Sequence, residues 1–344
     1  MKVTTIGLDL AKSVLVVHGV DAQGKTVLKK QLRRDQVTAY FANLPACLVG
    51  MEACGSAHHW ARQLRALGHE VRLMAPQFVK PYVKTNKNDA ADAQAIGEAV
   101  ARPSMRFVPV KTPEQQAILA LHRARQGFVE ERTAHANRIR GLLAEYGLVL
   151  PQGIAHIRQR VPLLVDEARQ KLPGMFIELI GRLLEHFKVV DAQVHDLEAQ
   201  IERWAQEQDD CRRLQAIPGI GPITASALVA SIGDARAFSS GRQLAAWLGL
   251  VPRQHSSGGK NVLLGMSKRG DSYLRTLLIH GARSVIFARQ RKAPVGSWLQ
   301  KLLARCHANV AAVALANKNA RTIWALLAHK RSYQAGFVPT PQQG

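Results

Sequence analysis

The chain has 344 residues, 47% of them hydrophobic, which is long enough for two or three domains with buried cores. Its net charge of +22 and its pI of about 10.5 indicate a polyanionic partner, nucleic acid before membrane. The four cysteines form no CxxC pair, which argues against a zinc finger or a disulfide framework. The sequence shows no signal peptide and no apolar stretch long enough to span a membrane, so we expect a soluble protein of a reducing compartment.

The first hundred residues predict an α/β domain. Five strands are expected, at 3–9, 13–20, 25–32, 47–52 and 70–74. Three helices are expected, at 35–43, at 56–67 and from Asp89 to about 101, the last capped by Asn86 or Asn88. The order is therefore β-β-β-α-β-α-β-α, and the close spacing of the first three strands predicts an antiparallel meander.

Four carboxylates fall where such a sheet would bring them together. Asp9 ends the first strand and Glu52 ends the fourth, and ligands bind at strand ends in open α/β sheets. Asp89 and Asp92 are three residues apart, so they share one face of a helix in its first turn. Acids at a helix start also interact favourably with the macrodipole without any ligand. In a chain this basic, however, the four together predict a Mg²⁺ site that acts on a phosphodiester.

The middle of the chain predicts long helices. Residues 113–150 read as a basic helix, and Leu150-Pro151 ends it and marks a domain boundary. Its arginines are either a solvated face or phosphate contacts: Arg123, Arg125, Arg132, Arg138 and Arg140. From 175 to 207 apolar residues recur at nearly heptad spacing, which fits a helical hairpin within one chain or the arm of a coiled-coil dimer. The charged outer faces favour the dimer.

A glycine-rich turn follows this segment. Ile217-Pro218-Gly219-Ile220-Gly221, before an alanine-rich helix, is typical of a helix-hairpin-helix motif. Gly219 and Gly221 would let the backbone approach a nucleic-acid phosphate, and the amides of the next helix start would bind it without reading bases. The alternative is a turn that only packs two helices, and the charge of the chain favours nucleic acid.

The C-terminal part is strongly basic. Residues 251–344 contain 15 Lys and Arg but a single acid, Asp271. Ser256-Ser257-Gly258-Gly259 predicts an exposed loop with phosphate ligands around it, namely Arg253, His255 and Lys260. Alone, such a stretch is most often only a loop, because a serine hydroxyl is a weak nucleophile that needs activation. Helices are expected at 271–288, 298–305 and 308–329, and a disordered tail from Ser332.

The sequence resembles a large family of bacterial insertion-sequence transposases with a DEDD set of acids, which includes Piv-type invertases and recombinases directed by a bridge RNA. The motifs that carry the resemblance are Asp9 in Ile-Gly-Leu-Asp-Leu-Ala-Lys, Glu52 in Met-Glu-Ala-Cys-Gly, and Asp89 and Asp92 in Asn-Lys-Asn-Asp-Ala-Ala-Asp-Ala. The stretch from Gly249 to Arg275 resembles the C-terminal domain of the same family. The resemblance covers the chain from Thr5 to about His329.

The resemblance implies a domain plan and a chemistry. The plan is a RuvC-like, RNase H-like α/β domain at 1–150, a coiled-coil dimerisation segment at 151–210, a mainly helical transposase domain with the helix-hairpin-helix at 211–330, and a tail at 331–344. The four carboxylates would hold Mg²⁺. Ser257, with Ser256 as the fallback, would attack DNA and form a phosphoserine link. Arg253, Lys260, Lys268, Arg269 and Arg275 would contact nucleic acid.

The resemblance also implies partners. They are double-stranded donor and target DNA, a structured non-coding guide RNA that pairs with both, and further copies of the chain in a dimer or a dimer of dimers. If one protomer supplied Ser257 and another the carboxylates, the active form would need at least two copies. The protein would then work at the nucleoid in a bacterial cytoplasm.

Two alternatives stay open. A RuvC-like nuclease would cut with metal-activated water, and Ser257 would only be a loop residue. An actin-like phosphotransferase would explain the first hairpin around Asp9, but it requires a second glycine-rich phosphate loop, which the sequence lacks. A protein that only binds nucleic acid would explain the charge but not the four carboxylates.

Overall fold

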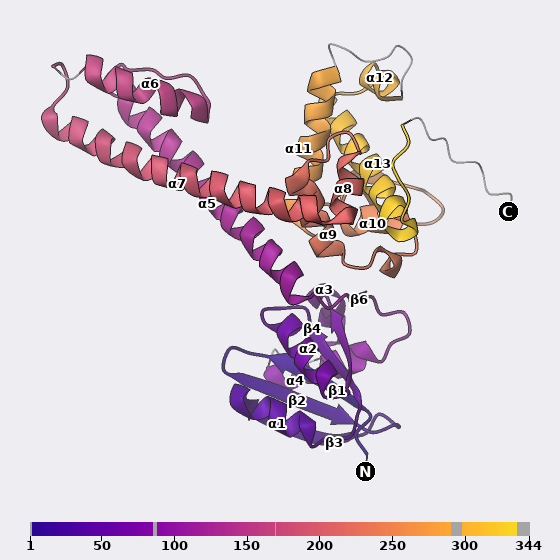
Figure 1. Ribbon diagram of the computed structural model, residues 1–344. Helices are drawn as coiled ribbons and strands as arrows, with labels where there is room; N and C mark the ends of the chain where they lie inside the picture. Colours follow the sequence, from indigo (N-terminus) through magenta and orange to yellow (C-terminus); the bar gives the residue numbers. More distant parts are fainter. Residues whose placement is uncertain (1, 85–87, 169, 290–297, 336–344) are drawn as a thin grey trace. The chain divides into compact units, whose positions relative to one another are not determined.

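The computed structural model describes residues 2–84, 88–168, 170–289 and 298–335. The chain divides into two compact units, Met1–Glu114 and Gln115–Gly344, shown as ribbons in Figure 1. The first unit is mixed α/β and the second is mostly helical, as the sequence predicts. None of the helices in the described part of the chain is long and apolar enough to cross a membrane.

The N-terminal unit contains a six-stranded sheet in the order β3-β2-β1-β4-β5-β6. Its strands are β1 (Thr5–Leu10), β2 (Val14–Val20), β3 (Thr26–Arg33), β4 (Leu48–Glu52), β5 (Glu70–Met74) and β6 (Phe107–Val108). The first three form the predicted antiparallel meander, and β4 and β5 run parallel to β1. The short β6, which the sequence does not signal, pairs antiparallel with β5. The predicted order of elements is otherwise confirmed, except for a short helix at Pro76–Val79 between β5 and the helix that begins at Asp89.

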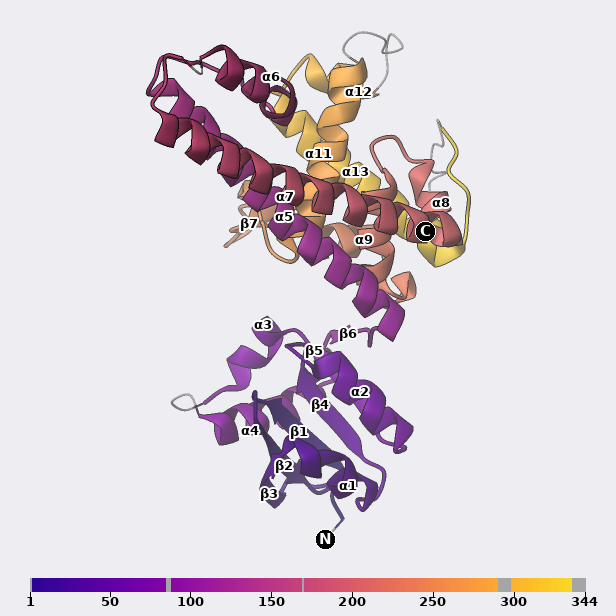
Figure 2. The ribbon, with the colours of Figure 1, turned by 60° about the vertical axis from the view of Figure 1, so that its left-hand side comes forward.

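Helices cover both faces of this sheet, as Figure 2 shows for α2 and α4. They are α1 (Val37–Ala42), α2 (Ala57–Ala66), α3 (Pro76–Val79) and α4 (Asp89–Val100), with 3₁₀ turns at Arg34–Gln36 and Lys80–Tyr82. Helices α1 and α2 bury Phe41 and Trp60 in one core with Ile6 and Leu8 of β1. Helix α4 packs on the opposite face, where Ile96 belongs to a second cluster.

The C-terminal unit begins with three helices that we call the arm: α5 (Pro113–Ala144), α6 (Ile154–Glu167) and α7 (Gly174–Glu207). Helices α5 and α7 cross as a hairpin, and α6 lies along its outer end in both views (Figures 1 and 2). One apolar cluster joins all three, through Ile139 of α5, Ile157 of α6 and Phe187 of α7. Because α5 packs into the arm, the first compact unit ends at Glu114, well before the boundary that the sequence predicts near residue 150.

The near-heptad seam of α7 is covered within a single chain. Its buried residues are Ile180, Leu184, Phe187, Val190, Val194, Leu197 and Ile201. Within one chain this segment packs as the hairpin alternative describes, and its part in a dimer stays a prediction. Two arginines of the basic helix also serve the hairpin, because Arg125 pairs with Glu198 and Arg132 with Asp191. Their guanidinium groups are thus committed to α7, whereas Arg123 and Arg138 are exposed.

Asp191 ties the three helices of the arm together. Arg132 of α5 donates to it at 2.9 Å, and Arg158 of α6 at 2.6 Å and 2.7 Å. Burial raises the pKa of Asp191, but the hydrogen bonds from Arg158 and Arg132 outweigh it and hold the pKa below its usual value. The carboxylate is therefore ionised at neutral pH, and it satisfies two cations at once.

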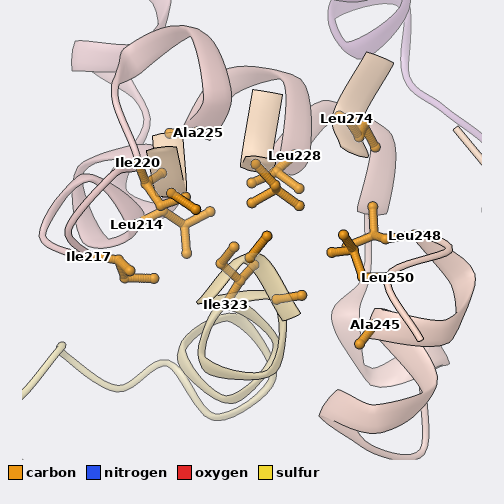
Figure 3. Close-up of a cluster of buried hydrophobic side chains, with 14 of the residues drawn as sticks. Leu214, Ile217, Ile220, Ala225, Leu228, Ala245, Leu248, Leu250, Leu274 and Ile323 are labelled. Carbon is orange, nitrogen blue, oxygen red and sulfur yellow. The ribbon is translucent and has the colours of Figure 1, made fainter. Parts of the chain in front are cut away.

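The rest of the unit is a helical bundle. Its helices are α8 (Asp209–Gln215), α9 (Pro222–Ile232), α10 (Gly241–Trp247), α11 (Ser272–Arg289), α12 (Trp298–Leu303) and α13 (Ala308–His329). A 3₁₀ turn lies at Ala235–Ala237, and β7 (Pro252–Gln254) and β8 (Leu263–Met266) form a hairpin. Figure 3 shows part of its core, where Ile323 of α13 lies among Leu214, Leu228 and Leu248. The predicted helices α11, α12 and α13 are confirmed, whereas α6 and α10 were not signalled by the sequence.

A buried polar network joins the arm to the bundle. His122 of α5 is 1% exposed, and its two ring nitrogens lie 2.9 Å from the hydroxyl of Tyr273 and 3.1 Å from that of Ser226. Burial, followed by the charge of Arg125, lowers the pKa of His122 to about 4. The imidazole is therefore neutral at pH 7, and the network links α5, α9 and α11.

Candidate active site

Strand alternation turns Asp9 and Glu52 toward the same face of the sheet. Ile6 and Leu8 of β1 belong to the core under α1 and α2, as do Val49 and Met51 of β4. Successive side chains of a strand point to opposite faces, so Gly7 and Asp9, like Gly50 and Glu52, belong to the face that α4 covers. Strands β1 and β4 are parallel neighbours, with Leu8 opposite Met51, so their carboxyl ends lie side by side.

Two glycines let α4 lie directly on β1. A Cβ at Gly7 would be 1.9 Å from the carbonyl oxygen of Ala93 and 2.4 Å from the amide nitrogen of Gly97. On the neighbouring strand, a Cβ at Gly50 would be 2.6 Å from that of Val100. A larger residue at Gly7 would push the helix away from the strand. This backbone contact, two residues before Asp9 on β1, fixes how the start of α4 sits over the strand ends.

Three carboxylates converge at this point. Asp9, Asp89 and Asp92 each place one carboxylate oxygen within 4.8 Å of the others. Helix α4 begins at Asp89, and the side chain of Asn88 caps it by accepting a hydrogen bond from the Ala91 amide at 2.8 Å. The predicted cap at Asn88 is confirmed, and Asn86 lies outside the described residues. The first helical turn therefore carries both acids of the α4 pair to the end of β1.

Glu52 lies beside this trio. It does not share the 4.8 Å group of the described acids, but both Glu52 and Asp9 act on the same thiol, that of Cys54. Burial raises the pKa of Cys54, and the negative charges of Glu52 and then Asp9 raise it further. The thiol therefore stays protonated at neutral pH, which makes Cys54 a poor nucleophile. Both strand-end carboxylates therefore lie close enough to the Cys54 thiol to act on its pKa.

This donor set fits a hard divalent cation. Carboxylate oxygens are the ligands that Mg²⁺ prefers, whereas softer metals select nitrogen and sulfur. Like charges this close repel one another, so a bound cation would relieve the repulsion among Asp9, Asp89 and Asp92. The arrangement can hold a metal ion at the carboxyl ends of two parallel strands.

Ser257 stands on an exposed hairpin of the other unit. The turn Ser257-Gly258-Gly259-Lys260 is closed by the Lys260 amide, which donates to the Ser257 carbonyl at 3.0 Å. Gly258 and Gly259 have φ of 55° and 77°, the left-handed values that a two-residue type I′ turn requires at both central positions. The glycines thus place Ser257 at the last paired position before the turn.

The two candidate serines differ in their hydrogen bonds. The hydroxyl of Ser256 accepts from Gln254 at 3.0 Å and from the Val262 amide at 3.3 Å, so it helps to hold the hairpin. The hydroxyl of Ser257 has no hydrogen-bond partner within the part of the chain that the structure describes. Of the two, Ser257 is the one whose oxygen is available to an incoming group.

The basic residues near the hairpin divide into exposed and structural ones. Arg253, Lys260 and Arg269 are exposed, as is Lys268, which adopts a left-handed conformation. Arg275 is different, because its guanidinium donates to the carbonyls of Leu248 at 3.3 Å and Arg269 at 3.0 Å. These two hydrogen bonds fix the chain before α11, so Arg275 has a structural role that the sequence did not signal.

Of the two glycines in the predicted phosphate-binding turn between α8 and α9, only one is accessible to a phosphate. A Cβ at Gly219 would lie 2.6 Å from the carbonyl oxygen of Gly281 on α11, so this glycine, with φ of 87°, permits close packing inside the bundle. Gly221 is exposed, and a Cβ there would meet nothing within 4 Å. Helix packing therefore explains Gly219, and Gly221 at the start of α9 is the position that a phosphate could approach.

Other glycine contacts were not found by sequence reasoning. A Cβ at Gly249 would be 2.0 Å from the carbonyl of Arg269, and a Cβ at Gly270 would be 2.0 Å from that of Trp247. These contacts lock together the two ends of the segment that carries the hairpin. As with Gly7, the signal was a glycine without an evident turn role, and the partner lies too far along the chain to be read from the sequence.

Comparison with known proteins adds the family. A DEDD-type transposase model of IS110, described as "Transposase", matches residues 6–148, and the "Transposase IS116/IS110/IS902 family" model matches residues 211–295. A "Probable family 20 transposase" of Pseudomonas aeruginosa is 54% identical over 338 residues, covering 98% of this chain and 100% of that protein. The chain belongs to the IS116/IS110/IS902 family of transposases.

Further relatives of this transposase family agree. The "Transposase for insertion sequence element IS1111A" of Coxiella burnetii is 46% identical over 332 residues, 96% of this chain and 91% of the relative. The "Transposase for insertion sequence element IS1328" of Yersinia enterocolitica is 43% identical over 323 residues, 94% of this chain and 96% of the relative. The predicted membership of an insertion-sequence transposase family is thus confirmed. The acids at the start of α4 and the serine hairpin lie within the two matched ranges.

Proposed function

We propose that this transposase cuts and exchanges DNA strands with Mg²⁺ held by Asp9, Glu52, Asp89 and Asp92 in an RNase H-like domain. The observation that carries the proposal is the convergence of Asp9, Asp89 and Asp92 within 4.8 Å at the carboxyl end of a strand. The sheet order and the parallel pairing of β1 with β4 and β5 support the RNase H-like assignment. When bound, Mg²⁺ would stabilise negative charge on the attacking and leaving oxygens of a phosphodiester.

The residues of the chain divide this work. Asp9 and Glu52 project from rigid strands, so they would fix the position of the cation. Asp89 and Asp92 would complete its ligands from the first turn of α4, whose amide ends also favour negative charge. A phosphate that reaches this edge would be oriented by the same cation that these four carboxylates hold. Their arrangement by backbone packing means that little reorganisation is needed when DNA arrives.

Ser257 would carry the covalent step. Its hydroxyl oxygen would lose its proton and form an ester bond to phosphorus, while the bond from phosphorus to one sugar oxygen breaks and that oxygen takes up a proton. This conserves the energy of the phosphodiester, so a second sugar hydroxyl can reverse the step and join a new strand. The exposed, unpartnered hydroxyl of Ser257 supports this role over that of Ser256, whose hydroxyl is engaged twice.

Nucleic acid would be held by the exposed cations near the hairpin and by Gly221. Arg253, Lys260, Lys268 and Arg269 offer phosphate contacts in a region, 251–344, whose single acid is Asp271. A structured guide RNA that pairs with donor and target DNA, and a dimer or dimer of dimers, complete the proposal. Sequence choice would then lie in base pairing, and the protein would mainly contact backbones.

The competing function is a nuclease that uses metal-activated water. It would need the same four carboxylates but no serine, so the two functions differ in a single oxygen atom. The phosphotransferase alternative loses its support, because the family assignment covers the segment around Asp9. The decisive test is therefore the role of Ser257.

That test compares Ser257→Ala with Ser256→Ala on labelled DNA and Mg²⁺, analysed on a denaturing gel. Wild type and Ser256→Ala should give a covalent protein–DNA adduct, and Ser257→Ala should give none while it still binds DNA. Asp92→Ala should abolish both cutting and adduct, since it removes a metal ligand. Unimpaired cutting by Ser257→Ala would establish the nuclease alternative instead.

Guide RNA is tested separately, by sequencing the RNA that co-purifies with the chain expressed together with its flanking DNA. We expect enrichment of one flanking transcript and a steep salt dependence of binding. The affinity should fall about a thousandfold between 50 and 200 mM salt if about six phosphates are contacted. Recovery of bulk cellular RNA only, with no enriched transcript, would remove the guide from the proposal.

A further inference from the structure

Three side chains meet on the surface of the arm, outside the residues assigned above to the reaction or to nucleic acid. Glu131 and His135 are four residues apart on α5, so they share a face, and His186 of α7 lies opposite them. Each offers one ligand atom within 4.8 Å of the others. The His186 ring nitrogen Nε2 lies 3.0 Å from a carboxylate oxygen of Glu131, and the two imidazole rings are 4.4 Å apart between centroids.

The geometry is fixed by buried neighbours. Ala136 follows His135 and is 1% exposed, and Phe187 follows His186 and is fully buried. Both neighbours belong to the cluster that joins α5 and α7. The ligands are therefore carried by packed helical backbone instead of a loop, which is the condition for a preformed site.

One ring nitrogen of His135 lacks a hydrogen-bond partner in this cluster. Its ring nitrogen Nδ1 is buried and has no hydrogen-bond partner among the described residues. A ring nitrogen of a neutral imidazole is the atom with which histidine binds a metal ion.

We propose that Glu131, His135 and His186 bind a transition-metal ion of the Zn²⁺ class. Two imidazoles and a carboxylate suit Zn²⁺ or Co²⁺, whereas Mg²⁺ prefers oxygen ligands alone. Three protein ligands leave the fourth tetrahedral position to a water molecule. The ion would cross-link α5 to α7 near the middle of the arm, next to the Arg132–Asp191 pair that already joins these helices. This site is separate from the four carboxylates of the N-terminal unit, and it stands whether or not the proposed recombination chemistry is correct.

The test is a titration of the full-length protein, freed of metal with a chelator, with Co²⁺. Tetrahedral Co²⁺ with nitrogen ligands absorbs visible light strongly, whereas Co²⁺ held by carboxylates and water in octahedral geometry absorbs weakly. Wild type should give the strong bands, Zn²⁺ should abolish them by displacement, and excess Mg²⁺ should not. His186→Gln should weaken Co²⁺ binding at least tenfold. The matched control is His195→Gln, an exposed histidine on the same helix but outside the cluster, which should bind like wild type.

Melting curves provide the second measurement. Zn²⁺ at about a hundred times its dissociation constant should raise the melting temperature of the arm by about 5 °C in wild type and not in His186→Gln. Equal melting temperatures of the metal-free proteins would show that the substitution does not disturb the fold. Strong Co²⁺ bands that persist in His186→Gln would overturn the proposal, and so would bands that Asp9→Asn abolishes. A wild-type protein without strong bands would leave the cluster as an ion pair and likewise overturn it.

Discussion

The carboxylate site of the N-terminal unit and the serine hairpin of the C-terminal unit are held in different ways. The first rests on backbone contacts, because Gly7 meets α4 at distances that exclude even a methyl group. The hairpin projects into solvent, where a Cβ at Gly258 or Gly259 would meet nothing within 4 Å. Every described residue from Pro252 to Gly265 is exposed, including the apolar Val262 and Leu263.

This difference indicates two ways of preparing a reaction. Carboxylates that must hold a cation gain from rigid placement, since their repulsion would otherwise spread them apart. A serine on an exposed hairpin has few packed neighbours, so we expect nucleic acid or a partner to set its final position. Leu263 and Leu264 of β8 are exposed apolar side chains, which fits a state in which a partner covers them.

The largest effect should come from the backbone contact itself. Gly7→Ala places a methyl group 1.9 Å from the carbonyl of Ala93, so α4 must move and carry Asp89 and Asp92 with it. We expect a loss of about 3 kcal/mol in the free energy of unfolding of the N-terminal unit and no measurable strand cleavage. Urea denaturation and the DNA gel assay measure both.

The control for this substitution is Gly55→Ala, which also adds one methyl group close to the strand ends. A Cβ at Gly55 would meet nothing within 4 Å, so its stability should stay within about 0.5 kcal/mol of wild type. If Gly7→Ala were as stable and as active as Gly55→Ala, the backbone contact of Gly7 with α4 would not be what holds the carboxylate site in place.

The next effect concerns acid, which should destabilise the helical bundle that supports the hairpin. The pKa of His122 is about 4 in the folded state because of its burial, against about 6.5 in an unfolded chain. Below pH 6.5 the unfolded chain therefore binds a proton that the folded chain does not. Stability of the C-terminal unit should fall by about 3 kcal/mol as the pH decreases from 6.5 to 4, and this histidine should have no effect above that range.

Tryptophan fluorescence during urea unfolding measures this loss, because Trp204, Trp247, Trp298 and Trp324 lie in the C-terminal unit and only Trp60 in the other. His122→Gln keeps an amide near Ser226 and Tyr273 but does not titrate, so the dependence on pH should be smaller by about the same amount. A variant with the full wild-type dependence would mean that other groups cause the acid sensitivity.

Much of the N-terminal unit could be predicted from the sequence, because its signals are local. Alternation, strand ends and an N-cap can each be read within ten residues, and together they brought Asp9, Glu52, Asp89 and Asp92 to one edge. What could not be read was the contact that aligns them, since Gly7 and Gly97 are 90 residues apart in the sequence. A glycine in the middle of a strand signals a close approach but does not name its partner.

The C-terminal unit was less predictable for the same reason. The seam of α7 was visible, but heptad spacing does not distinguish a partner helix in the same chain from one in another. Gly219 matched a phosphate-binding pattern and instead packs on Gly281, 62 positions further along. The hairpin was predicted only as a loop, because β7 and β8 are too short to give an alternating signal.

The smallest effect should be a change in the turn that carries Ser257. Gly259 has φ of 77°, so Gly259→Ala costs about 1 kcal/mol of backbone strain without any clash. The Lys260 amide, which donates to the Ser257 carbonyl at 3.0 Å, should then exchange its hydrogen about fivefold faster. Gly258→Asn is the matched control, because it creates Asn-Gly, the favoured pair for a type I′ turn, and should leave the exchange unchanged or slow it. Hydrogen exchange by NMR or mass spectrometry resolves this segment. If both variants exchanged like wild type, the turn would not be what holds Ser257, and the hairpin would be as firmly supported as the carboxylates.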